Sequence, residues 1–221
     1  LQLPARWTVT YDIERRNTPI LTTRNALIGQ PVDTLSELGT TFTDAEIYAL
    51  AEARTPVMSS YALSATRPLG QRFQVAFDVI GSRIDATAAS GGVAAQPESG
   101  LNSTYQLQLF ANSLFRNGDF NVIALRFDDS SMARLSSMGV TSRVPVFGAW
   151  RVSPRIRIDQ RRLAVDGSTQ WLYVPSLRID YQRNRTLFEL ELAAELGSRD
   201  QVAQPDESRR YFIGMGYRIG F

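Results

Sequence analysis

The chain has 221 residues, a formal net charge of +2, and 24 basic residues that are all arginine, with no histidine and no cysteine. These counts exclude disulfide bonds, thiol nucleophiles and imidazole chemistry, and a charge so near neutral gives no strong basic field for nucleic acid. The length suits one large all-β domain or barrel.

Alternation of apolar and polar residues recurs along the whole chain and predicts ten β-strands, because a period of two places successive side chains on opposite faces. No apolar run approaches the roughly 20 residues that a membrane-spanning helix needs, but the strands of a membrane barrel give a much fainter hydropathy signal. In chain order the predicted strands are Trp7–Glu14, Met58–Thr66, Phe73–Val79, Tyr105–Asn112, Ile123–Asp128, Met138–Val144, Arg155–Asp159, Trp171–Tyr181, Phe188–Leu196 and Arg209–Phe221.

The long segment 17–57 between the first two predicted strands contains helix signals. Thr43 and Glu46 form a capping box, which predicts a helix over 44–53. A shorter helix is expected over 34–38. The segment is therefore expected to form a small helical cap over or inside the mouth of a barrel, with simple coverage of the rim as the alternative.

The connections between the predicted strands alternate in length. They are short after the second, fourth and eighth strands and of modest length after the sixth, and the Asn-Gly pair in "RNGD" (116–119) predicts a type I′ hairpin turn. The longest connections follow the first, third and ninth strands, at the opposite end. Short turns at one end and long loops at the other are typical of outer-membrane barrels, and an even number of strands places both chain ends on the turn side.

The last predicted strand alternates apolar residues up to the end of the chain. Its apolar positions are Tyr211, Ile213, Met215, Tyr217, Ile219 and Phe221. This pattern resembles the C-terminal signature of Gram-negative outer-membrane proteins, which ends in Phe and is recognised by the barrel assembly machinery. The resemblance implies that these six residues form an assembly signal.

Four other segments bear a looser resemblance to a known group of proteins. "LTTRNALIGQPV", "RPLGQRFQ", "ASGGV" and "STQWLYVPSLRIDYQ" look like the C-terminal barrel region of large proteobacterial proteins with periplasmic tetratricopeptide repeats. No such repeat occurs in this sequence. The resemblance implies a larger parent protein, and a start at Leu1 without Met leaves open both a processed mature form and a piece of a longer chain.

A soluble β-sandwich is the alternative fold, because its strands also alternate apolar and polar residues. The membrane is favoured because the apolar faces carry almost no charge and because aromatic residues cluster near strand ends, as in the girdles of membrane barrels. These aromatics are Trp7, Tyr61, Phe73, Tyr105, Phe115, Trp171, Tyr173, Tyr181, Tyr211 and Phe221.

We therefore expect an all-β fold, an antiparallel transmembrane β-barrel of about ten strands with a helical first extracellular loop. Residues 1–221 would form one barrel or the C-terminal part of a larger one, and residues 17–57 would form the helix-containing loop.

If the apolar faces meet lipid, the alternate faces line the interior. Strands of opposite charge lie next to each other, which predicts cross-strand ladders of arginine and carboxylate. These pairs would either fill and neutralise the interior or leave arginines that attract an anionic solute. Ten closed strands favour an occluded interior, since open channels appear at roughly 16 strands. The predicted ladder residues are Arg126, Arg143, Arg155, Arg157, Asp159, Arg178, Asp180, Glu189, Glu191, Glu195, Arg210 and Arg218.

These features predict a structural role rather than catalysis. The barrel proteases and phospholipases of the outer membrane need histidine, which this chain lacks, and carboxylates such as Glu189 and Glu191 favour ladder pairing over acid–base chemistry. No phosphate loop, dinucleotide fingerprint or calcium loop occurs in the sequence, so no cofactor or metal is expected.

The expected protein is an outer-membrane anchor of an envelope assembly in a Gram-negative bacterium. Its expected partners are outer-membrane lipid, the barrel assembly machinery, and other envelope proteins or further chains of a larger complex, without nucleic acid. The alternative is a pore domain for export or uptake of a polar or anionic solute, such as a polysaccharide.

Overall fold

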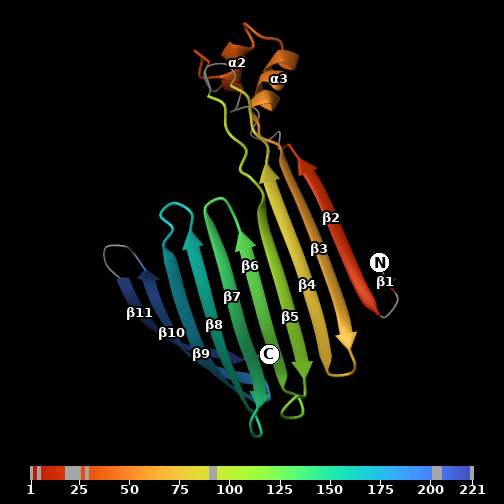
Figure 1. Ribbon diagram of the computed structural model, residues 1–221, viewed down its shortest axis with the longest axis vertical. Coiled ribbons are helices and arrows are strands. Elements are labelled where there is room, and N and C mark those ends of the chain that lie inside the picture. Colours follow the sequence, from red (N-terminus) through yellow and green to blue (C-terminus); the bar gives the residue numbers. More distant parts are fainter. Residues whose placement is uncertain are drawn as a thin grey trace. The chain divides into compact units, whose positions relative to one another are not determined.

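The structure, a computed structural model, describes residues 2–3, 6–17, 26–27, 30–89, 94–200 and 206–219. These residues form a large antiparallel sheet and two helices (Figure 1). The strands are β1 (Gln2–Leu3), β2 (Trp7–Arg16), β3 (Met58–Leu69), β4 (Phe73–Ile84), β5 (Asn102–Asn112), β6 (Phe120–Asp129), β7 (Ala133–Pro145), β8 (Trp150–Leu163), β9 (Thr169–Arg183), β10 (Thr186–Asp200) and β11 (Asp206–Ile219), and the helices are α2 (Leu35–Leu38) and α3 (Asp44–Arg54).

The strands form one sheet in chain order, each hydrogen-bonded to its neighbours in sequence. This order confirms the predicted all-β, antiparallel class. In the described part of the chain, β1 pairs only with β2 and β11 pairs only with β10. The sheet therefore has two edges, and the predicted closure into a barrel is not present in the strand pairing.

The ten predicted strands correspond to β2 through β11, and several are longer than predicted. The largest difference is at β8, which begins at Trp150 rather than at Arg155. Pro154, which has no backbone N–H to donate, nevertheless lies within β8 opposite Leu177. The short β1 has no counterpart among the predicted strands.

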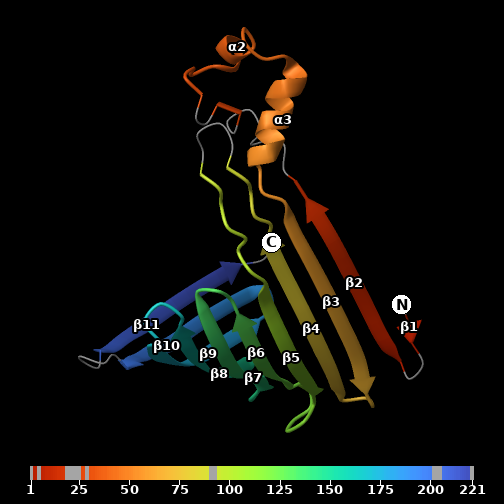
Figure 2. The same ribbon diagram turned by 45° about the horizontal axis from the view of Figure 1, so that its top comes forward.

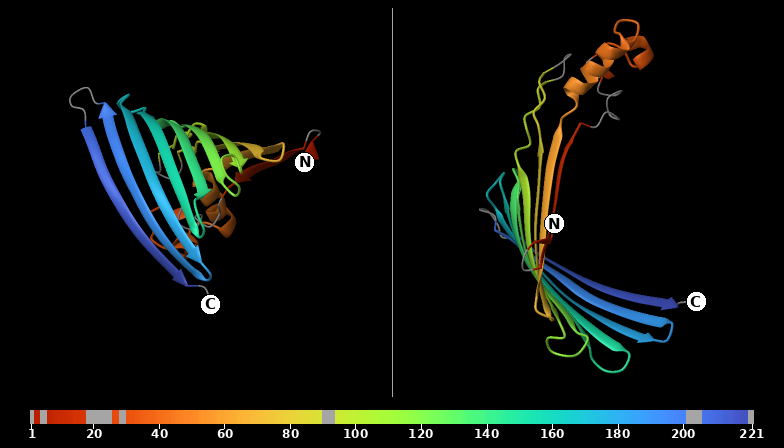
Figure 3. Two further views of the ribbon diagram at one scale, coloured as in Figure 1. Left: turned by 90° about the horizontal axis from the view of Figure 1, so that it is seen from below. Right: turned by 90° about the vertical axis from the view of Figure 1, so that its right-hand side faces the viewer.

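The chain divides into two compact units. The first comprises Leu1–Thr10, Leu63–Val79 and Thr104–Phe221, and the second comprises Tyr11–Ala62 and Ile80–Ser103. Taken by itself, the sheet of the first unit twists and curves from β5 to β11 (Figure 3).

The second unit contains both helices (Figure 2). At the start of α3, the Thr43 backbone N–H donates to the Glu46 carboxylate over 2.8 Å, and Thr43 Oγ1 accepts from the Glu46 N–H. This confirms the predicted capping box. The helix α2 is capped at its N-terminus by Thr34, whose hydroxyl accepts from the Glu37 N–H. The helical segment packs around a small apolar cluster of Ala26, Leu38 and Ala51, with Leu27, Val32, Leu35, Phe42 and Ile47 against it.

The hairpin between β5 and β6 differs from the predicted type I′ turn. That turn needs a positive φ at both Asn117 and Gly118, and only Gly118 has one, at 83°. The Asp119 side chain closes the loop instead, because its carboxylate accepts hydrogen bonds from the backbone N–H groups of Leu114, Phe115 and Arg116 over 2.7–2.8 Å. The sequence predicted the hairpin correctly and its turn type wrongly.

Candidate functional site

Each strand from β6 to β11 has an apolar face and a polar face, and the register between these strands keeps both faces continuous. On the apolar face, Met138 lies opposite Leu125 on one side and Ile158 on the other. Leu125 is 45 % exposed and Met138 is 47 % exposed. On the polar face, Ala124 lies opposite Gly139, and both are only partly exposed. The sheet thus exposes its apolar side chains and shields small residues on its polar side.

A row of four aromatic side chains crosses the apolar face beside the short turns at 146–149 and 184–185. Trp150 lies opposite Tyr181, Tyr181 opposite Phe188, and Phe188 opposite Tyr217. The successive ring centroids are 4.8, 6.5 and 4.7 Å apart, within the range of favourable aromatic pairs. We call these four residues the turn-side aromatic row.

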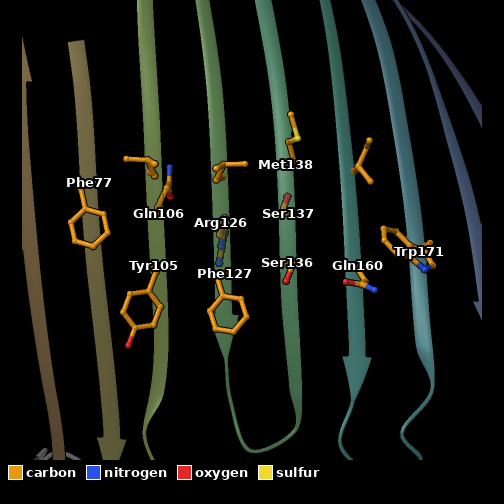
Figure 4. A pocket seen from close by; sticks show the side chains of 13 residues that line it. Phe77, Tyr105, Gln106, Arg126, Phe127, Ser136, Ser137, Met138, Gln160 and Trp171 are labelled. Atoms are coloured by element: carbon orange, nitrogen blue, oxygen red, sulfur yellow. The ribbon is translucent and has the colours of Figure 1, made fainter. Parts of the chain in front are cut away.

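A second set of aromatic residues lies farther along the same face (Figure 4). It consists of Phe77, Tyr105, Phe127 and Trp171, which we call the loop-side aromatic group, and it borders a shallow apolar hollow of about 430 Å³. The rings of Tyr105 and Phe127 have their centroids 6.3 Å apart.

The two aromatic sets are separated by an apolar stretch of sheet. On β9, Trp171 belongs to one set and Tyr181 to the other, so the strand between them is roughly 33 Å long at about 3.3 Å per residue. Charged side chains appear on this face of β6, β7 and β8 only beyond the loop-side group, where Arg134 lies opposite both Asp129 and Arg162. The Arg134 Nε lies 3.0 Å from Asp129 Oδ1.

The polar face is organised by a short motif, Arg-x-Asp, in which both side chains lie on the same side of a strand. The arginine Nε lies 2.7–3.0 Å from an aspartate oxygen in each of three pairs on β6, β8 and β9. In these pairs the aspartate side chains are 21, 16 and 6 % exposed, whereas the arginines are 52, 39 and 42 % exposed. The Arg-x-Asp pairs of this face are Arg126–Asp128, Arg157–Asp159 and Arg178–Asp180.

Two of these aspartates are also hydrogen-bonded to a neighbouring strand. Asp128 accepts from Thr104 Oγ1 over 2.6 Å, and Asp159 accepts from Ser137 Oγ over 2.5 Å. Each aspartate thus lies beside the Nε of its arginine, and the arginine is the more exposed side chain of each pair.

Arg178 combines its Arg-x-Asp pair with a cross-strand ion pair. Its terminal Nη2 bonds to the carboxylate of Glu189 on β10, and Glu189 lies opposite Asp180. On the other side Glu189 lies opposite Gly216, where an added Cβ would be 3.1 Å from Glu189 Oε2. The glycine on β11 therefore leaves room for the carboxylate that binds Arg178.

A second hollow, of about 390 Å³, lies on the polar face over β5 to β8. Its lining includes Arg126, Arg155 and Arg157 together with the small residues Ala124 and Gly139. We call it the arginine hollow. Small side chains between long basic ones leave this part of the face open.

The structure places the predicted assembly signal on β11, at the edge of the sheet. Tyr211, Ile213, Met215, Tyr217 and Ile219 are between 48 and 86 % exposed. Phe221 lies outside the described residues.

The predicted ladder residues lie on the polar face, but most of their ion pairs run along a strand rather than between strands. Arg178–Glu189 is the cross-strand pair among them in the described part of the chain. Glu195 lies opposite Arg210 without a direct ion pair. No ion pair within the described ranges involves Arg143, Arg155, Glu191, Glu195, Arg210 or Arg218.

Two features of these faces were not predicted from the sequence. The aromatics Trp150, Phe188 and Tyr217 were not assigned to a common row, because only the strand register brings them together. The Arg-x-Asp motif is visible in the sequence, since a spacing of two puts both side chains on one strand face.

Among the described residues, no group of three or more His, Cys, Asp or Glu side chains is placed to hold a metal ion. No helix in the described part of the chain has the length and apolar character to span a membrane. Comparisons of this chain with protein-family models, with curated proteins and with solved structures found no match.

Proposed function

We propose that this chain forms the wall of an outer-membrane β-barrel that anchors an envelope assembly, with its apolar face toward lipid and its polar face inside. The observation that best supports this proposal is the exposed apolar face between the turn-side aromatic row and the loop-side aromatic group. The roughly 33 Å of strand between them corresponds to about 25 Å of height at the roughly 40° tilt of barrel strands. That height equals the apolar band of outer-membrane barrels, and aromatic rings favour both membrane–water interfaces.

In the proposed barrel, the free edge of β11 pairs with β2 or with a strand of another chain. An unpaired strand edge exposes backbone donors and acceptors that hydrocarbon cannot satisfy, so a membrane sheet must close. The exposed alternation of Tyr211, Ile213 and Met215 on β11 supports its role as the strand that the assembly machinery recognises.

The Arg-x-Asp pairs favour an anchor with a braced, largely occluded interior and no catalytic role. Paired charges hold one another within the polar face and need no bound solute. The alternative, a pore domain, is favoured by the arginine hollow, which is open space among basic side chains. Conductance across planar bilayers separates the two, because large steady single-channel currents from this chain alone contradict the occluded anchor.

Membrane residence is tested by fractionating cells that express the chain. We expect the protein in the outer-membrane fraction, extracted by detergent and not by salt or alkali, and migrating differently on gels before and after boiling. Recovery as a detergent-free monomer would support the sandwich alternative and overturn the proposal.

Barrel closure is tested by disulfide cross-linking, for which the absence of native cysteine gives a clean background. One cysteine replaces Thr10 on β2, and a second is scanned along β11 at Arg210, Phe212 and Gly214. A cross-link within one chain indicates closure by this chain, and a cross-linked dimer indicates a barrel of several chains. If neither forms in the membrane-inserted protein, the barrel proposal fails.

A further inference from the structure

We infer that the arginine hollow binds a carboxylate-bearing saccharide through the guanidinium tips of Arg126 and Arg157. The inference rests on the proposed function in one respect, that the polar face lies inside the barrel. The arginine hollow is then the part of that interior which the Arg-x-Asp pairs do not fill. It assigns this face a ligand site in addition to its structural ion pairs.

Arg178 shows how an Arg-x-Asp pair presents a carboxylate site. Asp180 occupies the Nε side of the guanidinium, with a distance of 2.7 Å, and the terminal Nη2 remains available. Glu189 fills that position from the next strand. A guanidinium has five N–H donors in a fixed plane, so one aspartate does not use its full capacity for binding carboxylates.

At Arg126 and Arg157 no second carboxylate of the protein takes the place that Glu189 has at Arg178. Glu189 lies opposite Asp180 on the strand that follows. The residue opposite Asp128 on β7 is Leu135, and the residues opposite Asp159 are Ser137 on β7 and Leu172 on β9. None of these three side chains carries a charge. Within the described part of the chain, Arg126 and Arg157 each form an ion pair with their own aspartate and with no second carboxylate.

Arg126 and Arg157 both line the arginine hollow. Arg126 on β6 lies opposite Ser137, and Arg157 on β8 lies opposite Gly139, so the arginines flank β7 from both sides. The small residues of β7 leave a hollow of about 390 Å³, which falls within the range of small-molecule sites.

The remaining lining favours a saccharide over a bare carboxylate. Gln106 and Gln108 supply amide groups and Thr141 supplies a hydroxyl, which can bond to sugar hydroxyls. Arg155 adds a third guanidinium, without an ion pair among the described residues. The three arginines of the hollow face two aspartates, Asp128 and Asp159, and this leaves one positive charge for an anionic ligand.

The test measures binding of a galacturonic acid trimer to the detergent-purified full chain by isothermal titration calorimetry. The methyl ester of the same trimer is the matched neutral ligand, and inorganic phosphate is the alternative anion. We expect the trimer to bind and its ester not to bind. We expect R126Q and R157Q each to weaken binding about tenfold or more, because each removes charge-assisted hydrogen bonds to the carboxylate.

Two further variants separate a specific site from a general charge effect. R210Q removes the same charge from the same face, on β11, and should leave affinity unchanged. L135E places a carboxylate opposite Asp128, as Glu189 lies opposite Asp180, and should weaken binding about tenfold by competing for Arg126, whereas the neutral L135Q should not.

Any one of three results would overturn the inference. R210Q could weaken trimer binding as much as R126Q does, the ester could bind as tightly as the trimer, or phosphate could bind more tightly than the trimer. These outcomes are distinguishable from failure of the proposed function. A chain that resides in the membrane and keeps its heat-dependent gel migration but does not bind the trimer contradicts only the ligand site. A chain that binds the trimer but fractionates without detergent contradicts only the membrane proposal.

Discussion

The Asp119 side chain determines the conformation of the connection between β5 and β6. The side chain is 2 % exposed, and its carboxylate accepts from three backbone N–H groups and from the Asn121 side-chain amide. Burial raises the pKa of the Asp119 carboxyl, but the hydrogen bonds from Arg116, Leu114 and Phe115 outweigh it, so the pKa lies below its usual range. The Asp119 side chain thus closes the turn, whereas the sequence predicted a turn formed by Asn117 and Gly118.

We expect D119A to open this loop without unfolding the sheet. The N–H groups of Leu114, Phe115 and Arg116 lose their acceptor, so hydrogen exchange at these three amides should accelerate by about tenfold or more. Exchange measured by mass spectrometry or NMR checks this, and D129N is the control, because Asp129 pairs with Arg134 at an exposed site. Unchanged exchange in D119A would contradict the role of the Asp119 carboxylate in closing the loop.

The same carboxylate makes the loop sensitive to acid. A lowered pKa in the folded state means that its stabilising contribution is present above the pKa of the unfolded carboxyl and is lost as the pH falls through the folded value. Protection at 114–116 should therefore persist at neutral pH and disappear only in strongly acidic buffer. In D119N, where no carboxyl titrates, protection at these amides should be independent of pH over that range.

At the level of elements, the sheet and the helical segment differ in what stabilises them. The strands β6 to β11 depend on long hydrogen-bonded ladders with their sequence neighbours. The helical segment has a small core around Leu38 and Ala51, so local signals such as the capping box contribute a larger share of its stability. This explains why the sequence predicted the start of α3 correctly.

We expect T43A to destabilise α3 by about 1 kcal/mol, because the N-cap oxygen no longer accepts from the Glu46 N–H. Hydrogen exchange of the first-turn amides of α3 measures this change, and exchange in β6 to β11 should stay the same. T41A is the matched control, since it removes an exposed hydroxyl two residues before the cap. An equal effect of T41A would show that the cap bond contributes little.

At the level of the whole molecule, the proposed membrane position assigns opposite environments to adjacent residues of one strand. Leu125 and Ala124 on β6 are neighbours in sequence and lie on opposite faces of the sheet. In water, an arginine on either exposed face costs little. In a bilayer the two positions become unequal.

We therefore expect L125R to destabilise the vesicle-inserted protein by about 2–4 kcal/mol, the cost of arginine near the bilayer midplane on a lipid-facing strand. A124R, on the polar face, should cost much less. Reversible unfolding from lipid vesicles, followed by tryptophan fluorescence, gives both values. Equal costs for the two variants would contradict a lipid-facing apolar surface.

The sequence alone was sufficient to predict the ten main strands, the two faces of each strand, the capping box of α3 and the position of the hairpin at 116–119. These features depend on residues that are close in the chain, through a period of two or a spacing of three. The tertiary structure decided which side chains on different strands are neighbours, because that depends on strand register and loop conformation. It brought Trp150, Tyr181, Phe188 and Tyr217 into one row, and it placed Glu189 where it could fill the site at Arg178. Opposite Asp128 and Asp159 the same register placed Leu135 and Ser137, which carry no charge, so Arg126 and Arg157 each pair with one carboxylate where Arg178 pairs with two.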